Sequence, residues 1–446
     1  MSSIASRTVS HRREIVRLAV PAFLALIAEP LFLLADSAII GHLGTAELAG
    51  LGIASAALVT AAGIFVFLAY GTTSVVARHL GAGDERSAVS AGIDGLWLAL
   101  ALGAVSATVV AVWARPICAA FGASPAVLEQ ATTYLRISAL GVPAMLVILA
   151  VTGVLRGLQD TTTPLVASVV GFGANILLNL LLVYGLHWGI AGSAWGTVLA
   201  QTGMGVALVT VLLVKARARH ARLRPHPGRV LAAARTGIPL LVRTLALRAT
   251  LLVTTWVAAS LGDVPLAAHQ VAMTVWSFLA FALDALAIAG QAITGRALGA
   301  GDREGVRVAM ATMVRWGVWG GLALGLVVVA LHGVVPALFT SDPAVQQALG
   351  AALVVVGLGQ AVAGYVFVLD GVLIGAGDGR WLAWGMVVTL AAYLPVILWV
   401  RAAGPSDSPT RDVVVLWVAF TVFMVIRGLG LGWRARHDDW MVVGAR

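Results

Sequence analysis

The stretch RHLGAGD at residues 78–84 recurs as RALGAGD at residues 296–302. The two copies are 218 residues apart, and the same offset relates Pro21 to Pro239 (239 − 21 = 218) and persists as far as Asp160. A constant offset over such a distance indicates an internal duplication without net insertion. The chain therefore contains two copies of one structural unit.

The segments around these loops are strongly apolar. Of the 446 residues 60% are hydrophobic and only 11% are charged, with a mean hydropathy of +0.96, whereas soluble domains carry about 25% charged residues. A helix that crosses a bilayer needs about 20 mostly apolar residues. We predict twelve such spans, at about 15–41, 48–75, 89–113, 127–153, 161–186, 190–214, 233–259, 266–293, 306–331, 345–372, 380–402 and 412–434.

Each repeat then holds six spans, an even number, so both repeats enter and leave the membrane on the same side. Such repeats are parallel, related by an axis along the membrane normal. We predict an all-α integral membrane protein with an N-terminal six-helix bundle at 1–214, a basic linker at 215–235 and a C-terminal six-helix bundle at 236–446. This duplication favours a transporter that works by alternating access over a channel or a lipid-embedded enzyme.

The positive charges predict the orientation of the chain. Most of the 29 basic residues lie in the N-terminal segment, the linker, the tail and the two repeated loops, which all fall on one side of twelve spans. Arg115, Arg401 and Arg411 are exceptions. The positive-inside rule therefore places both termini in the cytoplasm, in a cell (inner) membrane protein. The same distribution argues against nucleic acid as the partner of a chain of net charge +9.

Acidic residues inside the spans are the informative ones, because a charge at mid-bilayer costs at least about 2.5–3.5 kcal/mol. Four lie well inside: Glu29, Asp36, Asp284 and Asp370. None of them recurs at the equivalent position of the other repeat, where Leu247, Thr254, Val66 and Thr152 stand. A requirement of the scaffold should recur in both copies, whereas an ion site need occupy only one.

Glu29 and Asp36 are two helical turns apart, on one face of the first span and about 10.5 Å apart along its axis. Pro30 lies between them and should kink the helix, because it cannot donate to the carbonyl of Leu26. Carboxylates in such a place bind protons or cations. Alternatively, Asp36 accepts hydrogen bonds from neighbouring helices and only fixes their packing.

Further polar residues in the spans are secondary candidates. Asn175 and Asn179 share one face of the fifth span, where they could coordinate a cation or bond to Asp36, or only join helices. Arg248 and Asp284 could form a structural pair in the second bundle. Asp370 lies near the inner end of the tenth span and could cap or pair locally.

The sequence contains no metal-spaced Cys/His cluster, no Walker-type glycine loop and no nucleophile–base arrangement. We therefore expect neither an enzyme nor an ATP-driven pump, and no cofactor or metal site. An ion gradient is the expected source of energy.

The motifs resemble those of the multidrug and toxic compound extrusion (MATE) family, and most of all its DinF branch. The resemblance covers almost the whole chain: residues 29–44 (EPLFLLADSAIIGHLG) are similar to the family's first-helix motif, the loops at 78–84 and 295–302 to its paired loops, and residues 283–291 and 369–378 to DinF-type spans eight and ten. It implies two six-helix bundles that export organic, often cationic or amphipathic compounds in exchange for H⁺ or Na⁺.

The resemblance also assigns roles. Asp36 falls on the family's principal first-helix carboxylate and Asn175 on its fifth-helix asparagine. Asn179 stands where many DinF-type members have aspartate, which removes one charge from the site. Glu29 is an acid where a neutral residue is expected, so we hypothesise that it supplies the missing charge.

We predict an H⁺-coupled or Na⁺-coupled efflux antiporter with Asp36 as the coupling carboxylate, assisted by Asn175, Asn179 and Glu29 and hinged at Pro30. Its partners would be small organic substrates and membrane lipids, and a monomer is compatible with this function. A flippase for lipids or lipid-linked precursors is the alternative; Arg243 and Arg248 are its only evident headgroup-binding cations. A non-transporting scaffold would explain the duplication but not the one-sided acids.

Overall fold

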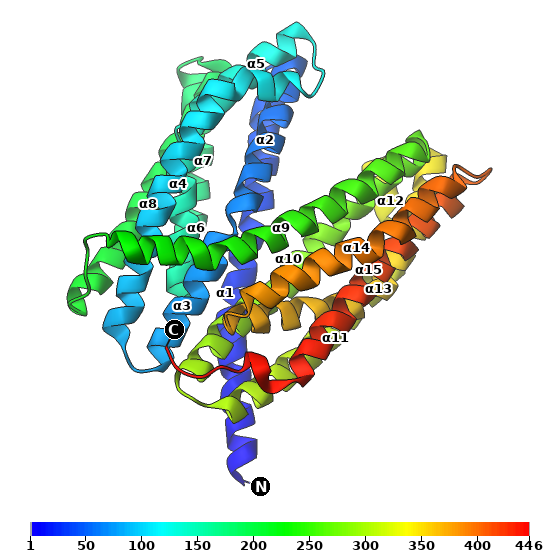
Figure 1. Ribbon diagram of the computed structural model, residues 1–446. Helices are drawn as coiled ribbons and strands as arrows, with labels where there is room; N and C mark the ends of the chain where they lie inside the picture. Colours follow the sequence, from blue (N-terminus) through cyan, green and yellow to red (C-terminus); the bar gives the residue numbers. More distant parts are fainter. Residues whose placement is uncertain (1, 446) are drawn as a thin grey trace. The chain divides into compact units, whose positions relative to one another are not determined.

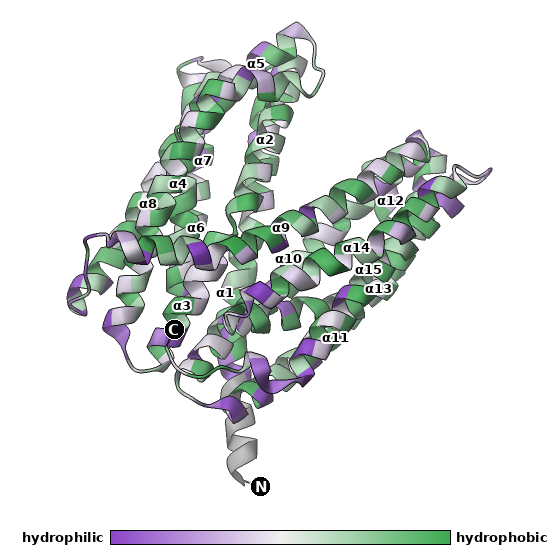
Figure 2. Cartoon of the chain, viewed as in Figure 1, coloured by the Kyte–Doolittle hydropathy of each residue, from purple (hydrophilic) through white to green (hydrophobic). Residues whose placement is uncertain are grey.

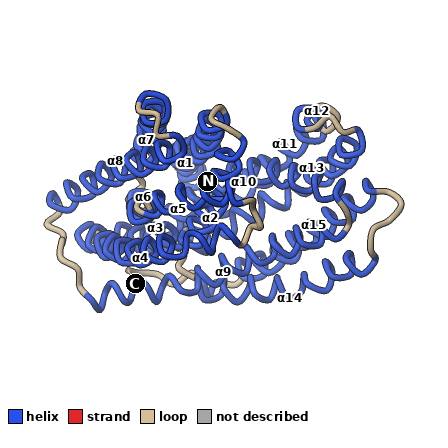
Figure 3. The backbone as a smooth tube through the Cα atoms, turned by 90° about the horizontal axis from the view of Figure 1, so that it is seen from above, coloured by secondary structure: helices blue, strands red, loops and turns tan. Residues whose placement is uncertain are grey.

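The computed structural model describes the backbone of residues 2–445, and the side chains of residues 12–445 except that of Glu29. Within this range every regular element is a helix (Figure 1). Figure 3 shows the same chain as helices joined by short loops. The predicted all-α class is confirmed.

The first repeat forms eight α-helices and one π-helical turn. They are α1 (Ser2–Gly41), α2 (Thr45–Phe65), α3 (Phe67–Gly81), α4 (Glu85–Ala119), α5 (Pro125–Ala139), α6 (Val142–Gly157), α7 (Thr162–Leu180), the π-helix η1 (Leu181–Gly185) and α8 (Gly189–Ala218).

The second repeat forms seven α-helices and a short 3₁₀ turn. They are α9 (Pro227–Ser260), α10 (Asp263–Gly299), α11 (Arg303–Leu331), α12 (Val335–Phe339), α13 (Pro343–Gly375), α14 (Gly379–Ala403), α15 (Pro409–Arg436) and η2 (Asp438–Trp440).

Among the described residues, eleven helical segments are long and apolar enough to cross a membrane, and a bent pair brings the number to twelve. Figure 2 shows hydrophobic residues along the helices and hydrophilic ones concentrated at their ends and in the loops. The predicted fourth span is this bent pair, α5 and α6, which meet at 52°. Helix α5 ends just before Gly141 and Pro143, because Pro143 cannot donate to the preceding turn.

The chain folds into two compact units, which are described separately. Of the described residues, 20–238 and 444–445 form one unit, and 2–19 and 239–443 form the other. Much of the predicted linker, 215–235, is helical, since α8 continues through Ala218 and α9 begins at Pro227. Proline is favoured at the first position of a helix, where its missing N–H is not needed.

The repeated loops have the same structure in both repeats. Gly83 and Gly301 have positive φ angles of 79° and 77°, a conformation that glycine adopts without strain. The carboxylates of Asp84 and Asp302 then each accept a hydrogen bond of 2.8 Å from the backbone N–H three residues further on. This is an N-cap, which satisfies a free donor in the first turn of α4 and α11. The sequence repeat is thus a local folding signal for a helix end.

In the unit of residues 20–238, a buried core cluster joins α1, α2, α4, α5, η1 and α8, and includes Ile40, Leu51, Leu135 and Ala194. Burying such side chains stabilises the unit where helices pack against each other rather than against lipid. Tyr134 belongs to the same cluster. Its hydroxyl group brings a hydrogen-bond donor into this apolar region.

Candidate ion-coupling site

Asp36 lies on α1 inside the unit of residues 20–238, and only 3% of its surface is exposed. One carboxylate oxygen accepts hydrogen bonds from Asn179 Nδ2 and from Ser193 Oγ, both at 2.7 Å. The other accepts from the hydroxyl of Tyr134 at 3.3 Å. Three further helices, α5, α7 and α8, thus position this one acid.

The network continues away from Asp36 through two asparagines on α7. Asn179 Nδ2 also lies 3.0 Å from Asn175 Oδ1, and Asn175 Nδ2 donates to Thr197 Oγ1 at 3.1 Å. All of these side chains are buried. Ser193 and Thr197 are four residues apart on α8, so they present their hydroxyls on one face, as the two asparagines do on α7.

One acceptor in this network is left over. Asn179 Oδ1 is buried and has no hydrogen-bond partner among the described atoms. The backbone of α8 approaches it so closely at Gly196 that a Cβ at that position would lie 2.0 Å from the oxygen. Buried acceptors are nearly always satisfied in native structures. Among the described atoms this oxygen is therefore an acceptor without a donor.

The charge of Asp36 is not balanced by a cation in the part of the chain that the structure describes. Its three hydrogen-bond partners, Tyr134, Asn179 and Ser193, are all neutral. A buried carboxylate that has only neutral donors is stabilised far less than one in an ion pair. The arrangement is suited to reversible binding of a proton or a monovalent cation.

The chain just beyond Asp36 is held by a second tyrosine. Tyr184 lies in η1, the π-helical turn that follows Asn179, and its hydroxyl donates to the carbonyl of Ile39 at 2.6 Å. π-Helical turns are rare in proteins, and many of those that do occur lie at functional sites. Here the turn ties the end of α1 to the helix that carries both asparagines.

The second repeat provides an internal comparison. Thr254 occupies the position equivalent to Asp36, and Tyr393 the position equivalent to Asn175. The two hydroxyls are 2.9 Å apart, and both side chains are fully buried. A polar contact therefore joins α9 to α14 as another joins α1 to α7. Only the contact between α1 and α7 includes a carboxylate.

The structure brings together three of the predicted site residues: Asp36, Asn175 and Asn179. Sequence reasoning missed Tyr134, Ser193 and Thr197; the spacing of the last two on one span was a signal that could have found them. The side chain of Glu29 lies outside the described residues, so its role stays a prediction. Pro30 lies within the continuous helix α1, and its role as a hinge also stays a prediction.

The secondary candidates lie in the other unit. Asp370 forms ion pairs with Arg243 and Arg427, of which Arg427 was not predicted. Asp284 is half-buried and Arg248 has an exposed side chain; their pairing remains a prediction. Within the described residues no group of three or more His, Cys, Asp or Glu side chains is arranged to hold a metal ion.

A cavity of about 310 Å³ lies elsewhere in the unit of residues 20–238. Its lining includes Phe67, His79, Asp94 and Arg229, from α3, α4 and the start of α9, and does not include Asp36. The carboxylate network is therefore separate from this cavity.

Comparison with known proteins identifies the family. A family model described as MatE matches residues 21–181 and again residues 239–399, two ranges separated by the offset of the sequence repeat. The chain belongs to the MATE family. DNA damage-inducible protein F of Escherichia coli is 32% identical over 97% of this chain and 94% of its own length.

Other relatives agree with this assignment. Protein DETOXIFICATION 44, chloroplastic, of Arabidopsis thaliana is 32% identical over 96% of the chain and 84% of its own length. The solved structure of a Vibrio cholerae MATE transporter variant superposes with a TM-score of 0.88 over 98% of this chain and 99% of that one, at 21% identity. This MATE protein is thus a multi-pass membrane transporter of an efflux family, and not an enzyme.

Proposed function

We propose that this MATE protein exports organic compounds in exchange for H⁺ or Na⁺, with Asp36 as the coupling carboxylate. The observation that carries the proposal is a single buried carboxylate whose described partners are all neutral donors. Such a group changes its interactions strongly when a cation binds, because its charge is then cancelled.

H⁺ is the coupling ion that we favour. With asparagine at position 179, the described part of the network contains one carboxylate, and a single proton neutralises it. A protonated carboxyl group becomes a donor and loses its charge, so the hydrogen bonds that it accepts from the three donors become weaker. Asn179 Oδ1, which has no partner among the described atoms, is the adjacent acceptor to which the new O–H can donate once the amide has turned.

The proposed coupling follows from these bonds. Protonation of Asp36 weakens the attachment of α1 to α5, α7 and α8, and α1 then bends at Pro30. The bend lowers the affinity for the exported compound, and the two six-helix bundles change to the inward-open state. Both termini remain in the cytoplasm. The substrates are cationic or amphipathic organic molecules, the working unit is a monomer, and the surrounding partners are membrane lipids.

The experiment is dye-induced dissipation of a pH gradient in proteoliposomes, with Na⁺ present and absent. Wild type should collapse the gradient when a cationic dye is added, and Asp36→Asn should abolish the effect. Asp407→Asn is the matched control, because it removes an exposed loop carboxylate outside the helices. Transport that requires Na⁺ and ignores the pH gradient would replace H⁺ by Na⁺ as the coupling ion.

If neither gradient drives any dye, the exporter is rejected and the flippase alternative moves ahead. Scrambling of a fluorescent lipid in the same proteoliposomes is then the deciding assay. A flippase should move lipid at a rate that Asp36→Asn leaves unchanged, since that carboxylate offers nothing to an anionic headgroup.

A further inference from the structure

The cavity of about 310 Å³ in the unit of residues 20–238 lies apart from the Asp36 network. Helices α3 and α4 and the start of α9 surround it. Its walls are mostly apolar and include Phe67, Leu68 and Leu98, none of which is exposed by more than 8%. Apolar pockets of this size with a few polar groups are typical sites for small organic ligands. The charged and polar groups of the lining therefore indicate what the cavity can hold.

Asp94 is the buried charge of this cavity. It lies on α4 with 6% of its surface exposed, and its described hydrogen-bond partner is the backbone of His226, in the loop that precedes α9. Among the described residues it forms no ion pair. Buried charges in proteins are usually paired, and a carboxylate offers about four acceptor sites. Asp94 can therefore accept further hydrogen bonds from a cationic group in the cavity.

Arg229 and His79 line the same cavity. Arg229 lies in the first turn of α9 with an exposed side chain. Its charge acts on Asp94, although the two do not form an ion pair. Nδ1 of His79 on α3 is buried and has no hydrogen-bond partner among the described atoms, whereas buried polar atoms are nearly always satisfied. A negative group, a positive group held away from it and an unpaired ring nitrogen thus line one apolar space.

The linker that leads into α9 is tied to α4. Trp97 Nε1 donates to the carbonyl of Leu223 at 3.1 Å, and Arg219 Nε donates to the carboxylate of Glu85 at 2.6 Å. Both bonds lie within the unit of residues 20–238. They hold the start of α9, and Arg229 with it, beside the helix that carries Asp94.

The second repeat does not contain this set of residues. By the offset of the sequence repeat, His79 has Ala297 as its counterpart and Asp94 has Thr312 (297 − 79 = 218 and 312 − 94 = 218). A requirement of the scaffold should recur in both copies, whereas a ligand site need occupy only one. The comparison therefore favours a role in binding over a role in the fold.

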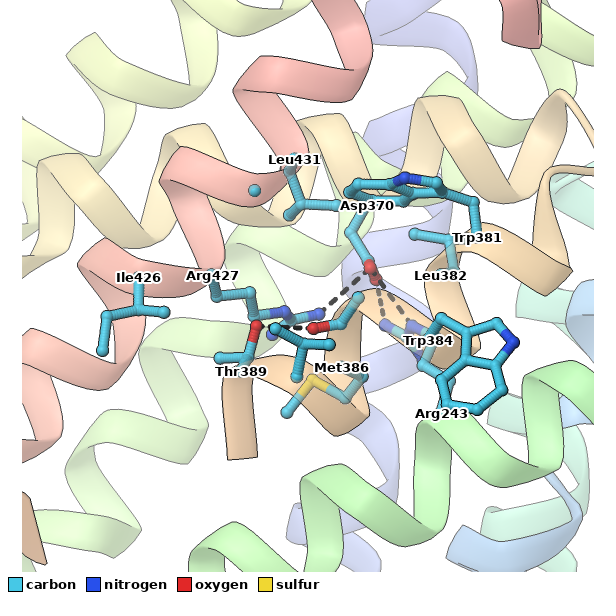
Figure 4. Close-up of a pocket in the computed structure, with 13 residues that line it drawn as sticks. Arg243, Asp370, Trp381, Leu382, Trp384, Met386, Thr389, Ile426, Arg427 and Leu431 are labelled. Carbon is cyan, nitrogen blue, oxygen red and sulfur yellow. Dashed lines mark hydrogen bonds and ion pairs between the residues drawn. The ribbon is translucent and has the colours of Figure 1, made fainter. Parts of the chain in front are cut away.

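The charges of another cavity, by contrast, are paired within the protein. A cavity of about 270 Å³ in the unit that contains residues 239–443 is lined by Arg243, Asp370 and Arg427, whose side chains Figure 4 shows converging on one point. Both arginines form ion pairs with the carboxylate. Asp370 therefore already has cationic partners, whereas Asp94 has none among the described residues.

We propose that the cavity lined by Asp94 and Arg229 binds small amphipathic zwitterions, which carry an ammonium group and an acidic group on one apolar body. The ammonium group, with three N–H donors, bonds to Asp94 and to Nδ1 of His79. The carboxylate or phosphate group pairs with Arg229 at the exposed rim, and the apolar body packs against Phe67 and Leu98. The site goes beyond the coupling function, because it lies outside the Asp36 network and takes a ligand of zero net charge.

A purely structural role for Asp94 is the competing explanation. In that case the carboxylate only fixes the loop before α9 through the backbone of His226, and no ligand depends on its charge. The two explanations differ for ligands that carry a single charge, because a zwitterion site needs both charges on the same molecule.

The experiment measures binding of L-phenylalanine to the purified full-length protein in detergent by isothermal titration. Two analogues with the same ring lack one charge each: 3-phenylpropionate has no ammonium group, and 2-phenylethylamine has no carboxylate. Phenylpropionate should bind at least about 10-fold more weakly than phenylalanine, because charge-assisted hydrogen bonds to a buried group are lost. Phenylethylamine should bind about 5-fold more weakly, since water screens the exposed Arg229. Equal binding of all three compounds would overturn the proposal.

Two variants should respond to different ends of the ligand. Asp94→Asn should weaken the binding of phenylalanine and phenylethylamine about 10-fold, and not that of phenylpropionate. Arg229→Gln should weaken phenylalanine and phenylpropionate about 5-fold, and not phenylethylamine. A folding defect would weaken all three compounds alike. Arg224→Gln, which removes an exposed linker arginine outside the lining, should leave each affinity nearly unchanged. Full phenylalanine binding by folded Asp94→Asn would contradict the assignment.

A glycine in the lining provides a test that leaves the charged groups intact. A Cβ at Gly71 would have no heavy atom within 4 Å, so a larger side chain can enter the cavity there. Gly71→Leu should fill the space and weaken phenylalanine binding at least about 10-fold. Gly52 on α2 is equally open but does not line the cavity, so Gly52→Leu should bind normally. Thermal unfolding followed by tryptophan fluorescence confirms that each variant is folded. Full binding by folded Gly71→Leu would exclude this cavity as the site.

The zwitterion can be a soluble amino acid or the headgroup of a lipid, and nanodiscs distinguish these sources. Phenylalanine affinity that falls when phosphatidylethanolamine, which carries an ammonium group, replaces phosphatidylcholine indicates a lipid headgroup. Affinity that is unchanged indicates a soluble zwitterion. Asp36→Asn should bind phenylalanine normally, so failure of the coupling proposal would leave this test intact.

Discussion

At the scale of single residues, Asp36 and Asp370, two of the buried aspartates, differ in their neighbours rather than in their exposed fraction. Asp36 has neutral donors around it, whereas Asp370 lies between Arg243 and Arg427. In the proposed mechanism the first binds and releases a cation, because its described hydrogen-bond partners carry no charge that competes. The second is occupied by permanent cations, since arginine does not lose its proton in proteins. Burial alone therefore does not identify a coupling group.

The substitution Asn179→Asp tests the charge of the coupling site. The nitrogen that donates to Asp36 at 2.7 Å becomes a second carboxylate oxygen, so the site gains a second group that can bind and release a proton. We expect the variant to bind one proton more per cycle. The ratio of H⁺ to dye, measured from the membrane potential that stops transport, should rise from one to two. An unchanged ratio would show that Asn179 does not set the stoichiometry.

The strength of each bond to Asp36 should follow its length. Ser193→Ala removes a 2.7 Å bond and should lower the free energy of unfolding by about 1.5–3 kcal/mol, the range for bonds to charged groups. Tyr134→Phe removes a 3.3 Å bond and should have an effect of about 1 kcal/mol or less. Thermal unfolding followed by tryptophan fluorescence shows which of the two variants loses more stability. The reverse order would mean that the hydroxyl of Tyr134 is the main support of the carboxylate.

At the scale of helices, α1 carries two prolines with different expected roles. Pro21 recurs as Pro239 in the other repeat, whereas Pro30 lies six residues before Asp36 on the same helix (36 − 30 = 6) and has Arg248 as its counterpart. Pro30→Ala should restore the missing helical hydrogen bond and stiffen α1 by up to about 3 kcal/mol. We expect dye binding to persist while the rate of dye export falls at least about tenfold. Pro21→Ala is the control and should transport at nearly the wild-type rate.

The start of α7 carries a pH-dependent contribution to stability. Burial alone would raise the pKa of Asp160, but hydrogen bonds from Thr163 and the charge of Lys215, 3.3 Å away, lower it below the usual value of 3.8. A lowered folded-state pKa means that the stabilisation is present above pH 3.8 and is lost as the pH falls through the folded-state value. Asp160→Asn should therefore reduce the unfolding temperature at pH 6. The difference from wild type should shrink towards pH 3; a difference that stays constant would contradict this assignment.

At the scale of the whole molecule, the sequence predicts the helices better than their contacts. The spans follow from apolar length, and the repeat follows from the loops that end in Asp84 and Asp302, because both signals are local. Ser193 and Tyr134 meet Asp36 across 157 and 98 residues, and only helix packing decides such contacts. The same holds for Arg427, which lies on the last helix. The bend between α5 and α6 was missed because the prediction of a span rests on length and tolerates an internal Gly and Pro.

The orientation of the chain can be tested through its one cysteine. Cys118 is fully buried, so Cys118→Ser should provide a folded background for single-cysteine labelling. Two exposed loop positions fall on opposite sides of the predicted topology: His220 between α8 and α9, among the basic residues, and Asp407 between α14 and α15. Because positive loops remain in the cytoplasm, a membrane-impermeant maleimide added to intact cells should label Asp407→Cys. His220→Cys should react only after the cells are permeabilised, and labelling of His220→Cys in intact cells would reverse the orientation.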